Sequence, residues 1–360
     1  MTIQIDNKSV KETNIDVLLE SIPNTRYYGS KKRLLPWIYQ ELKDYQFNTV
    51  LDIFGGTASV SLMFQAMQKN IRFNDALLSN CISAKVLLNG KYSQKTLNEV
   101  NIFFDSIDLN FDGTISKNYQ KIFFTDYENA WLDGAMQKIH KISHTPKRNL
   151  YLYLVMQASL MKRPFNLFHR ANLNLRTAKN IERKFGNLST WERSFSETIK
   201  KLMIDLIKLK KENISVIIKN PMTAENISNG YDLVYLDPPY VQKSKKDTYW
   251  KKYHFLEGLV NYPIMETLIE KELKINQLRK NMEMEQWEEP SLFKKKLFSL
   301  IEKHKKSIVV LSYMTNAIPS ENELVDCFNK TFSEVKISYY DLNHVMSKGK
   351  KTEILIVGVP

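Results

Sequence analysis

The sequence predicts an α/β fold, in which a mostly parallel sheet has helices on both faces and is interrupted by a helical, basic insertion. Three observations support this. Short apolar runs alternate with amphipathic helical segments up to about residue 76. From about residue 78 to 212 the pattern is helical and rich in basic residues. Apolar strand-like runs then return and continue to residue 359.

The first elements predict half of a βαβ unit. A glycine turn and an amphipathic helix occupy residues 25–45. The apolar residues of that helix fall on one face at Leu34, Leu35, Ile38 and Leu42. Residues 48–70 read as a short strand, a Gly-Gly turn and a helix, and residues 71–76 as a second strand. Because a helix connects these strands, we expect them to be parallel.

The later elements predict the rest of the sheet and the division of the chain. Further strands are expected at 214–220, 231–236, 307–315, 334–342 and 352–359. Residues 263–307 read as one or two charged helices broken near Pro290. We therefore predict an N-terminal extension (1–24), a discontinuous α/β domain (25–85 and 212–360) and a helical insertion (86–211).

The charge balance favours a polyanionic partner. Lys and Arg number 52 against 39 Asp and Glu, which gives a net charge of +13 and a pI near 9.3. Such an excess is typical of proteins that bind nucleic acid, and less often of proteins that bind anionic membranes. A solvated surface of a lysine-rich protein would give the same composition.

Cysteine usage and hydropathy exclude several classes of protein. The two cysteines, Cys81 and Cys327, cannot build a disulfide framework or a four-cysteine zinc site. The first twenty residues lack the apolar stretch of a signal peptide, and no window approaches the ~18 apolar residues of a membrane span. We expect a cytoplasmic protein that uses no metal and contacts no membrane.

A glycine turn followed by an acid is a candidate cofactor site. Gly55 and Gly56 lie between a strand and a helix, and Asp75 follows Gly56 by 19 residues at the end of the next strand. Small residues let the backbone approach a nucleotide-like ligand, and the acid can bind ribose hydroxyls. A glycine helix cap and an unrelated loop aspartate would look the same. The sequence has no GxGxxG or GK[ST] motif, so dinucleotide and ATP P-loop sites are disfavoured.

The turn Asp237-Pro238-Pro239-Tyr240 is the most informative stretch of the chain. It follows the apolar run 231–236, so in a parallel sheet it lies at the edge where ligands bind. Proline fixes the backbone and removes N–H donors, which leaves carbonyl groups as acceptors. A carboxylate, a proline carbonyl and a flat tyrosine ring suit a planar base that carries an exocyclic amino group. The lysine-rich stretch that follows would hold the phosphate backbone around that base.

With these residues in view, the chain resembles the Dam-like class of adenine-N6 DNA methyltransferases, α group, from about residue 25 to the C-terminus. The matching stretches are "RYYGSKKRLLPWI", "LDIFGGTASVSL", "FND", "KRPFNLFHRANLNLRTA", "DPPY", "YHFLEGL" and "VVLSYMTN". The family loop often ends Gly-x-Gly, whereas this chain has Gly56-Thr57-Ala58, which puts the loop geometry in doubt. The resemblance implies a Rossmann-like methyltransferase sheet with a mostly helical target-recognition insertion.

The resemblance also implies a set of site residues. Methyl transfer would depend on Asp237, Pro238, Pro239 and Tyr240. S-adenosyl-L-methionine would be bound by Tyr27, Lys31, Asp52, Phe54, Gly55, Gly56, Asp75 and Asp237. Double-stranded DNA would be contacted by Lys162, Arg163, Asn166, His169, Arg170, Arg176, Lys243, Lys245 and Lys246. The target adenine would have to leave the duplex to reach such a pocket.

Two other functions stay open at this point. Cytosine-N4 methylation also acts on an exocyclic amine, but enzymes of that type usually carry serine in place of Asp237. A DNA-binding module with an inactive pocket is the non-enzymatic alternative. The size of the chain and of its insertion is compatible with a restriction–modification system, in which a cognate endonuclease would act on the same site. We expect the protein to act as a monomer.

Overall fold

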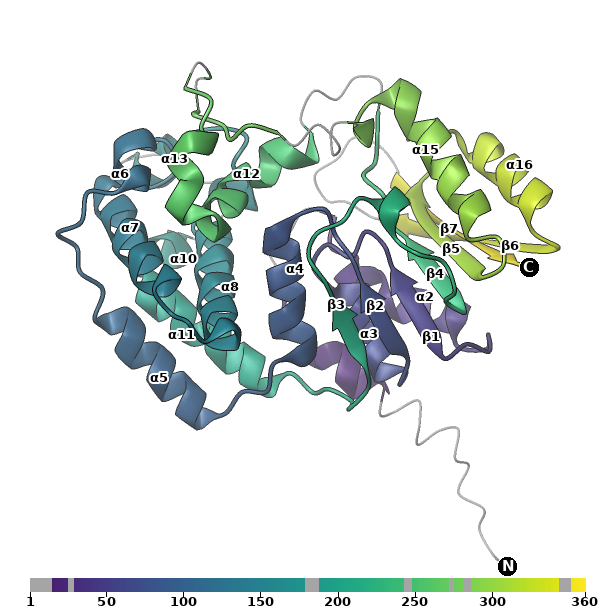
Figure 1. The fold of residues 1–360 in the computed structure, drawn as a ribbon, viewed down its shortest axis with the longest axis horizontal. Coiled ribbons are helices and arrows are strands. Elements are labelled where there is room, and N and C mark those ends of the chain that lie inside the picture. The colour runs from purple at the N-terminus through teal and green to yellow at the C-terminus, as the bar shows by residue number, and fades with distance from the viewer. Residues whose placement is uncertain are drawn as a thin grey trace, which may run out of the picture.

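A computed structural model describes residues 15–24, 29–178, 188–242, 248–271, 273, 275–280, 286–342 and 351–360. These residues form a seven-stranded sheet flanked by helices, beside a largely helical part (Figure 1). The predicted α/β fold is thereby confirmed. No helix in these ranges is long and apolar enough to span a membrane.

The sheet has the strand order β3-β2-β1-β4-β5-β7-β6. Its strands are β1 (Thr49–Asp52), β2 (Asn70–Phe73), β3 (Val216–Ile218), β4 (Leu233–Leu236), β5 (Ile308–Met314), β6 (Glu334–Leu342) and β7 (Lys351–Val359). The first five are mutually parallel, and β7 runs antiparallel between β5 and β6. The chain moves outward in one direction from β1 and in the other from β4, so ligands are expected in the crevice beyond the carboxyl ends of this pair.

Both faces of the sheet are covered by helices. Successive residues of a strand point to opposite faces, so each strand contributes to two core clusters. Val50 and Leu233 belong to one core cluster, and their neighbours Leu51 and Val234 belong to the other. On the first side lie η1 (Lys31–Leu34), α2 (Leu35–Leu42), α3 (Ser59–Ala66), α4 (Leu78–Ala84) and the π-helical turn η2 (Lys85–Asn89). On the second side lie η4 (Ala224–Asn226), α15 (Pro290–Lys303) and α16 (Glu321–Thr331).

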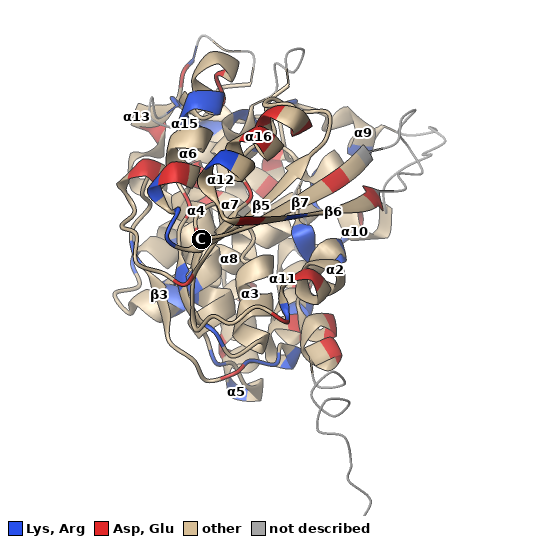
Figure 2. Cartoon of the chain, turned by 90° about the vertical axis from the view of Figure 1, so that its right-hand side faces the viewer, with Lys and Arg blue, Asp and Glu red and all other residues tan. Residues whose placement is uncertain are grey.

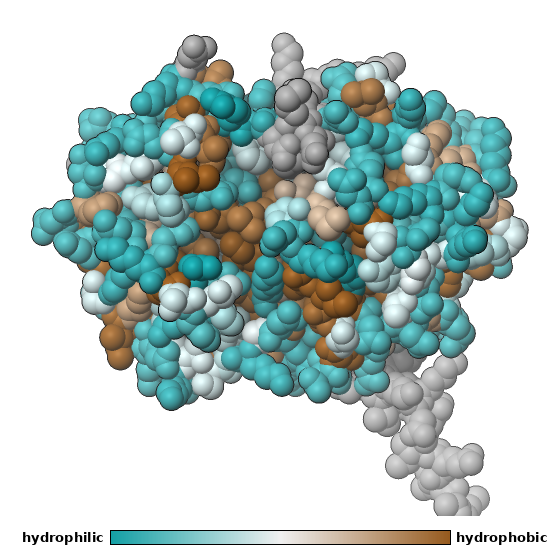
Figure 3. All heavy atoms as spheres, viewed as in Figure 1, coloured by the Kyte–Doolittle hydropathy of each residue, from teal (hydrophilic) through white to brown (hydrophobic). Residues whose placement is uncertain are grey.

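The predicted insertion is helical, as expected. It contains α5 (Gln94–Asp105), α6 (Thr114–Asn118), α7 (Asp126–His140), α8 (Thr145–Met161), η3 (Pro164–Asn166), α9 (Asn174–Thr177), α10 (Leu188–Glu192) and α11 (Phe195–Lys208). In Figure 3 hydrophobic residues gather in the middle of the visible face, between these helices and the sheet.

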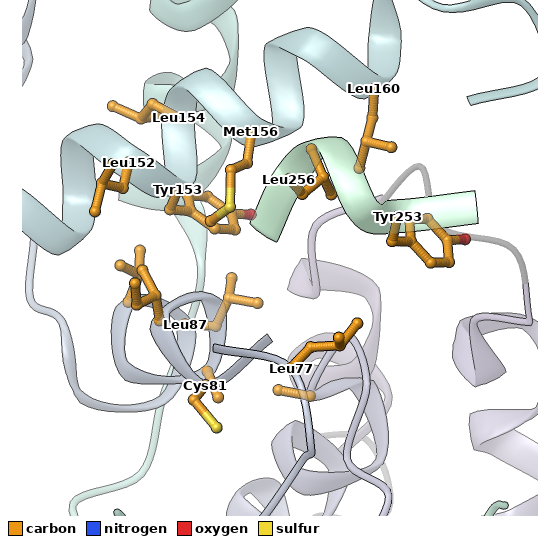
Figure 4. Packing of buried hydrophobic residues seen from close by; sticks show 14 of the residues in the cluster. Leu77, Cys81, Leu87, Leu152, Tyr153, Leu154, Met156, Leu160, Tyr253 and Leu256 are labelled. Atoms are coloured by element: carbon orange, nitrogen blue, oxygen red, sulfur yellow. The ribbon is translucent and has the colours of Figure 1, made fainter. Parts of the chain in front are cut away.

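Two of the predicted domain boundaries do not match the packing. The helices α12 (Tyr249–Val260), η5 (Tyr262–Ile264) and α13 (Met265–Leu268) were assigned to the α/β domain but lie against the insertion (Figure 1). The hydroxyl of Tyr262 donates to Asp133 of α7 at 2.7 Å. Figure 4 shows side chains from η2, α8 and α12 pointing toward one another, among them Leu87, Met156 and Leu256. The two parts therefore share one hydrophobic core.

The described end of the predicted N-terminal extension is also part of that core. Residues 15–21 are helical. The buried side chains of this segment are Ile15, Leu18, Leu19 and Ile22. Pro290 does not break a helix as predicted but is the first residue of α15, where its missing N–H has no helical partner to lose.

Candidate active site

Three aspartates meet at the carboxyl ends of neighbouring strands. Asp52 ends β1, Asp75 follows β2, and Asp237 follows β4. Burial raises the pKa of Asp52 to about 7, and the charges of the other two aspartates act in the same direction. Ser61 donates to Asp52 at 2.6 Å and partly offsets this rise. The sheet topology thus concentrates negative charge at the crevice between β1 and β4.

The glycine turn fits tightly against β2. A β-carbon on Gly55 would lie 2.0 Å from Cε2 of Phe73, and Gly56 has a left-handed φ of +50°. The N–H of Gly56 donates to Asp75 at 2.9 Å. Ala58 adopts a left-handed φ of 59° at the start of α3, a strain of about 1–3 kcal/mol. The Gly56-Thr57-Ala58 sequence therefore still forms a turn before α3.

Asp75 holds the backbone of this loop through hydrogen bonds. Its carboxylate accepts the N–H groups of Gly56 and Leu77, at 2.9 and 2.8 Å. Burial raises the pKa of Asp75, and these hydrogen bonds oppose the rise. Phe54, at the other end of the turn, is half-buried and packs edge-on against Trp287, with ring centroids 5.0 Å apart.

Lys31 joins the N-terminal motif to the Asp-Pro-Pro-Tyr turn. Its ammonium group donates to Oδ1 of Asp237 at 2.7 Å and also hydrogen-bonds the Tyr240 hydroxyl. The same ammonium lies 3.0 Å from Oε1 of Glu353. Burial would lower the pKa of Lys31, but these two carboxylates raise it above its ordinary value, so the lysine is charged.

The side chain of Asp237 is held in place by hydrogen bonds but remains partly exposed to solvent. Its side chain remains 19% exposed, whereas those of Lys31 and Glu353 are almost completely buried. Burial raises the pKa of Asp237 to about 6; the charge of Lys31 opposes this rise and that of Glu353 adds to it. Pro238 is buried, and Pro239 and Tyr240 are half-buried. The ring of Tyr240 packs edge-on against Tyr313, with centroids 5.1 Å apart.

Glu353 is the member of this centre that the sequence motifs miss. It lies in β7, far from both motifs in the chain, and accepts hydrogen bonds from Tyr240 at 2.6 Å and Ser312 at 2.8 Å. The available signal was a glutamate directly before the apolar run "ILIVGV", in the stretch "TEILIVGV". A carboxylate in a central strand is rarely buried without a partner.

Three predicted DNA contacts have side chains that are largely buried and paired within the protein. Lys162 pairs with Glu128 at 3.0 Å and donates to the Trp191 carbonyl at 2.9 Å. Arg176 makes two hydrogen bonds to the same glutamate, at 3.0 and 2.7 Å. Charges held this way cannot reach phosphates without breaking a buried network.

Arg163, the third of these, is 1% exposed and ties a loop together. Its guanidinium donates to the carbonyls of Phe123, Leu167, Arg170 and Ala171. It also lies 4.8 Å from the ring centroid of Phe123. Arg163 therefore fixes the backbone of residues 164–171 from inside.

That loop presents three further predicted DNA contacts. Asn166 and His169 are half-buried and Arg170 is exposed. Phe165 is 61% exposed, and both it and Asn166 have left-handed backbones, with φ of 61° and 56°. The predicted cofactor contact Tyr27 and the predicted DNA contacts Lys243, Lys245 and Lys246 lie outside the described residues.

Comparison with known proteins identifies the family. Residues 27–257, well over half of the chain, match the model of the D12 class N6 adenine-specific DNA methyltransferases. The chain belongs to this family. It is a DNA adenine-N6 methyltransferase, as the motifs predicted, and it takes its methyl group from a donor molecule. The matched residues include the glycine turn and the Asp-Pro-Pro-Tyr turn but end before Glu353.

Two relatives of the methyltransferase extend this match. It is 24% identical over 353 residues to the type II methyltransferase M2.HphI of Haemophilus parahaemolyticus, which covers 93% of this chain and 97% of that protein. It is 26% identical over 262 residues to the modification methylase LlaI of Lactococcus lactis subsp. lactis, covering 66% of this chain and 38% of that protein. Within the described ranges, no cluster of His, Cys, Asp or Glu side chains is arranged to hold a metal ion.

Proposed function

We propose that the enzyme transfers a methyl group from S-adenosyl-L-methionine to N6 of an adenine flipped out of double-stranded DNA. The observation that carries this proposal is the oriented carboxylate of Asp237, partly exposed at the crevice between β1 and β4. Asp237 and the Pro238 carbonyl would accept the two amino hydrogens of the adenine. This draws the nitrogen lone pair out of conjugation with the ring.

The residues at the crevice fit the proposed donor. Bound there, S-adenosyl-L-methionine would supply an electrophilic methyl group on a cationic sulfur. The clustered aspartates favour a cation, and Gly55 and Gly56 leave the turn without side chains, so that a ligand can approach its backbone. We assign donor binding to Tyr27, Lys31, Asp52, Phe54, Gly55, Gly56, Asp75 and Asp237.

Transfer would then occur by direct displacement, with no covalent bond to the enzyme. Burial raises the pKa of the Cys81 thiol to about 12, so it is a poor nucleophile. Catalysis would depend on positioning and electrostatics. The hydroxyl of Tyr240 is held by Glu353, and the tyrosine ring would stack on the flipped base.

On the DNA side, we assign contacts to the loop held by Arg163. Asn166, His169 and Arg170 would take phosphates or base edges, and Phe165 adds an exposed aromatic surface. Figure 2 shows both signs of charge interspersed on the side with β6 and α16, so the positive excess is not concentrated there. Lys243, Lys245 and Lys246 keep their proposed role of holding the backbone near the catalytic turn.

We further propose that the enzyme is the modification component of a restriction–modification system. The names of its relatives, a type II methyltransferase and a modification methylase, support this. A cognate endonuclease would cut the same site when it is unmethylated. Because its substrate is DNA, we place the enzyme in the cytoplasm, and we expect a monomer, which size-exclusion chromatography with light scattering would test.

The direct test is incubation of the protein with duplex DNA and S-adenosyl-L-methionine labelled in the methyl group. Nuclease digestion of the product should yield labelled N6-methyladenine. Labelled N4-methylcytosine would contradict the adenine assignment, and absence of label in DNA would contradict the enzymatic one. Base-resolution sequencing of DNA methylated in this way would identify the recognised site.

The pH dependence of kcat/KM should show an acid limb near pH 6. The ionised form of Asp237 is the stronger acceptor for the amino hydrogens, and its pKa is raised to about 6. Activity should therefore fall as the pH drops through this value, about two units above the limb that an ordinary aspartate would give. The measurement is a series of kcat/KM values across this pH range at constant ionic strength. A flat profile between pH 5 and 7 would argue against this assignment.

DNA affinity should depend steeply on salt. If several basic side chains contact phosphates, Kd should weaken on the order of 10³-fold between about 50 and 200 mM salt. Fluorescence anisotropy with a labelled duplex measures this. An affinity that hardly changes over that range would contradict phosphate contacts by the insertion.

A further inference from the structure

Glu353 has contacts that its position in the sheet does not require. It lies in β7 opposite Met314 of β5, and the residues that follow on the same face, Leu355 and Val357, belong to the hydrophobic core. Only 2% of its side chain is exposed. Burying a carboxylate at such a place is costly, and an apolar residue of similar size would often be at least as stabilising. Its contacts with the catalytic turn suggest another reason for it.

Three polar contacts of Glu353 converge on one oxygen. Oε1 accepts from the Tyr240 hydroxyl at 2.6 Å and from the Ser312 hydroxyl at 2.8 Å, and Lys31 Nζ lies 3.0 Å away. A tyrosine hydroxyl has one proton to give. It lies 3.2 Å from Asp237 Oδ1, so the shorter contact to Glu353 takes the proton.

This assignment of protons fixes the rest of the network. Lys31 has three N–H groups, which donate to Asp237, Glu353 and the oxygen of Tyr240. Burial and the neighbouring carboxylates raise the pKa of Tyr240 well above its ordinary value, so the hydroxyl keeps its proton. The contacts that the described residues make to Asp237 both go to Oδ1. Oδ2 is the oxygen left to face the crevice.

We infer that Glu353 is a positioning residue for methyl transfer: it anchors Lys31 and Tyr240 so that Asp237 is gripped by Oδ1 and presents Oδ2 to the target amino group. This rests on the proposed function, in which Asp237 accepts that hydrogen bond. Without Glu353, Lys31 would lose one of its two carboxylate partners, and the tyrosine hydroxyl would turn to Asp237. The carboxylate would then accept two donors and be less available to the base.

The charge of Glu353 should also be visible in the titration of Asp237. The ionisable groups that influence Asp237 are Lys31 from η1, Tyr240 of its own turn, Glu353 from β7, Asp52 from β1 and Tyr235 from β4. Burial raises the pKa of Asp237 most, and the charge of Lys31 lowers it. The negative charge of Glu353 raises it further. Removing its charge should move the acid limb of kcat/KM to lower pH.

The test is Glu353→Gln, which keeps the shape and removes the charge. We expect kcat to fall about 100-fold with little change in Kd for DNA, and the acid limb to shift to lower pH. In a Tyr240→Phe background, Glu353→Gln should lower kcat only about tenfold, because the two residues act through one hydrogen bond. Glu353→Asp, which restores the charge, should bring back the wild-type acid limb and part of kcat.

Controls separate positioning from folding. Glu225→Gln removes a glutamate that binds Trp287 and Lys296 on the other side of the sheet, and should leave the acid limb unchanged. Urea unfolding of the ligand-free single and double variants checks that each is folded and measures the Glu353–Tyr240 coupling without activity. An additive effect of the two changes on kcat, or an acid limb unmoved in Glu353→Gln, would overturn the inference. If the wild type itself methylates no adenine, the proposed function fails instead.

Discussion

Replacing Asp237 by alanine should lower kcat for methyl transfer by about 10³-fold or more, with Kd for DNA changed less than about threefold. Asp237 is the one carboxylate of the strand-end cluster that is both partly exposed and held by the ammonium group of Lys31. Its removal takes away the acceptor for the amino group but none of the predicted DNA contacts. Single-turnover methyl transfer and anisotropy on the same duplex measure the two quantities.

Asp326→Ala is the matched control, because Asp326 is exposed on α16, away from the crevice. It should behave as wild type in both assays. A rate for Asp237→Ala within tenfold of wild type would show that another group holds the amino hydrogens.

Replacing Arg163 by alanine should lower the free energy of unfolding by about 2–5 kcal/mol. The change leaves several backbone carbonyls of the 164–171 loop without their donor and removes a large buried side chain beside Phe123. Urea unfolding followed by circular dichroism measures the loss. Wild-type stability in this variant would contradict the buried arrangement.

Arg170→Ala should show the opposite behaviour. Its side chain is exposed, and the hydrogen bond to Arg163 uses its backbone carbonyl, which alanine retains. We expect a stability change below about 1 kcal/mol, weaker DNA binding, and a salt dependence of log Kd that is shallower by about one unit. The pair of variants therefore separates an arginine that builds the loop from one that uses it.

Patterns of hydrophobicity were sufficient for most of the fold. The apolar runs at 48–53 and 231–236 became β1 and β4, and the four apolar residues beginning at Leu34 are all buried. The N-terminal helix carried the same kind of signal, since Ile15, Leu18, Leu19 and Ile22 have helical spacing. Its many polar neighbours led us to treat it as an extension.

Charge alone did not reveal which basic residues face solvent. Lys162, Arg163 and Arg176 lie in the most basic stretch, yet they are interior because distant groups satisfy them. Those partners, such as Glu128 and the Phe123 carbonyl, come from α7 and the segment before it. A short sequence motif cannot predict such partners, because they lie in other segments of the chain. The same is true of Glu353, which reaches the catalytic turn only because β7 inserts beside β5.

The central claim is that Asp237 holds the amino group of a flipped adenine while Lys31 and Glu353 hold Asp237. A structure of the enzyme with its target duplex and an unreactive analogue of the methyl donor tests it most directly. We predict the adenine N6 atom at about 3 Å from Asp237 Oδ2, with Lys31 still on Oδ1. An adenine that stays stacked in the duplex, or an N6 atom held by other groups, would contradict the account.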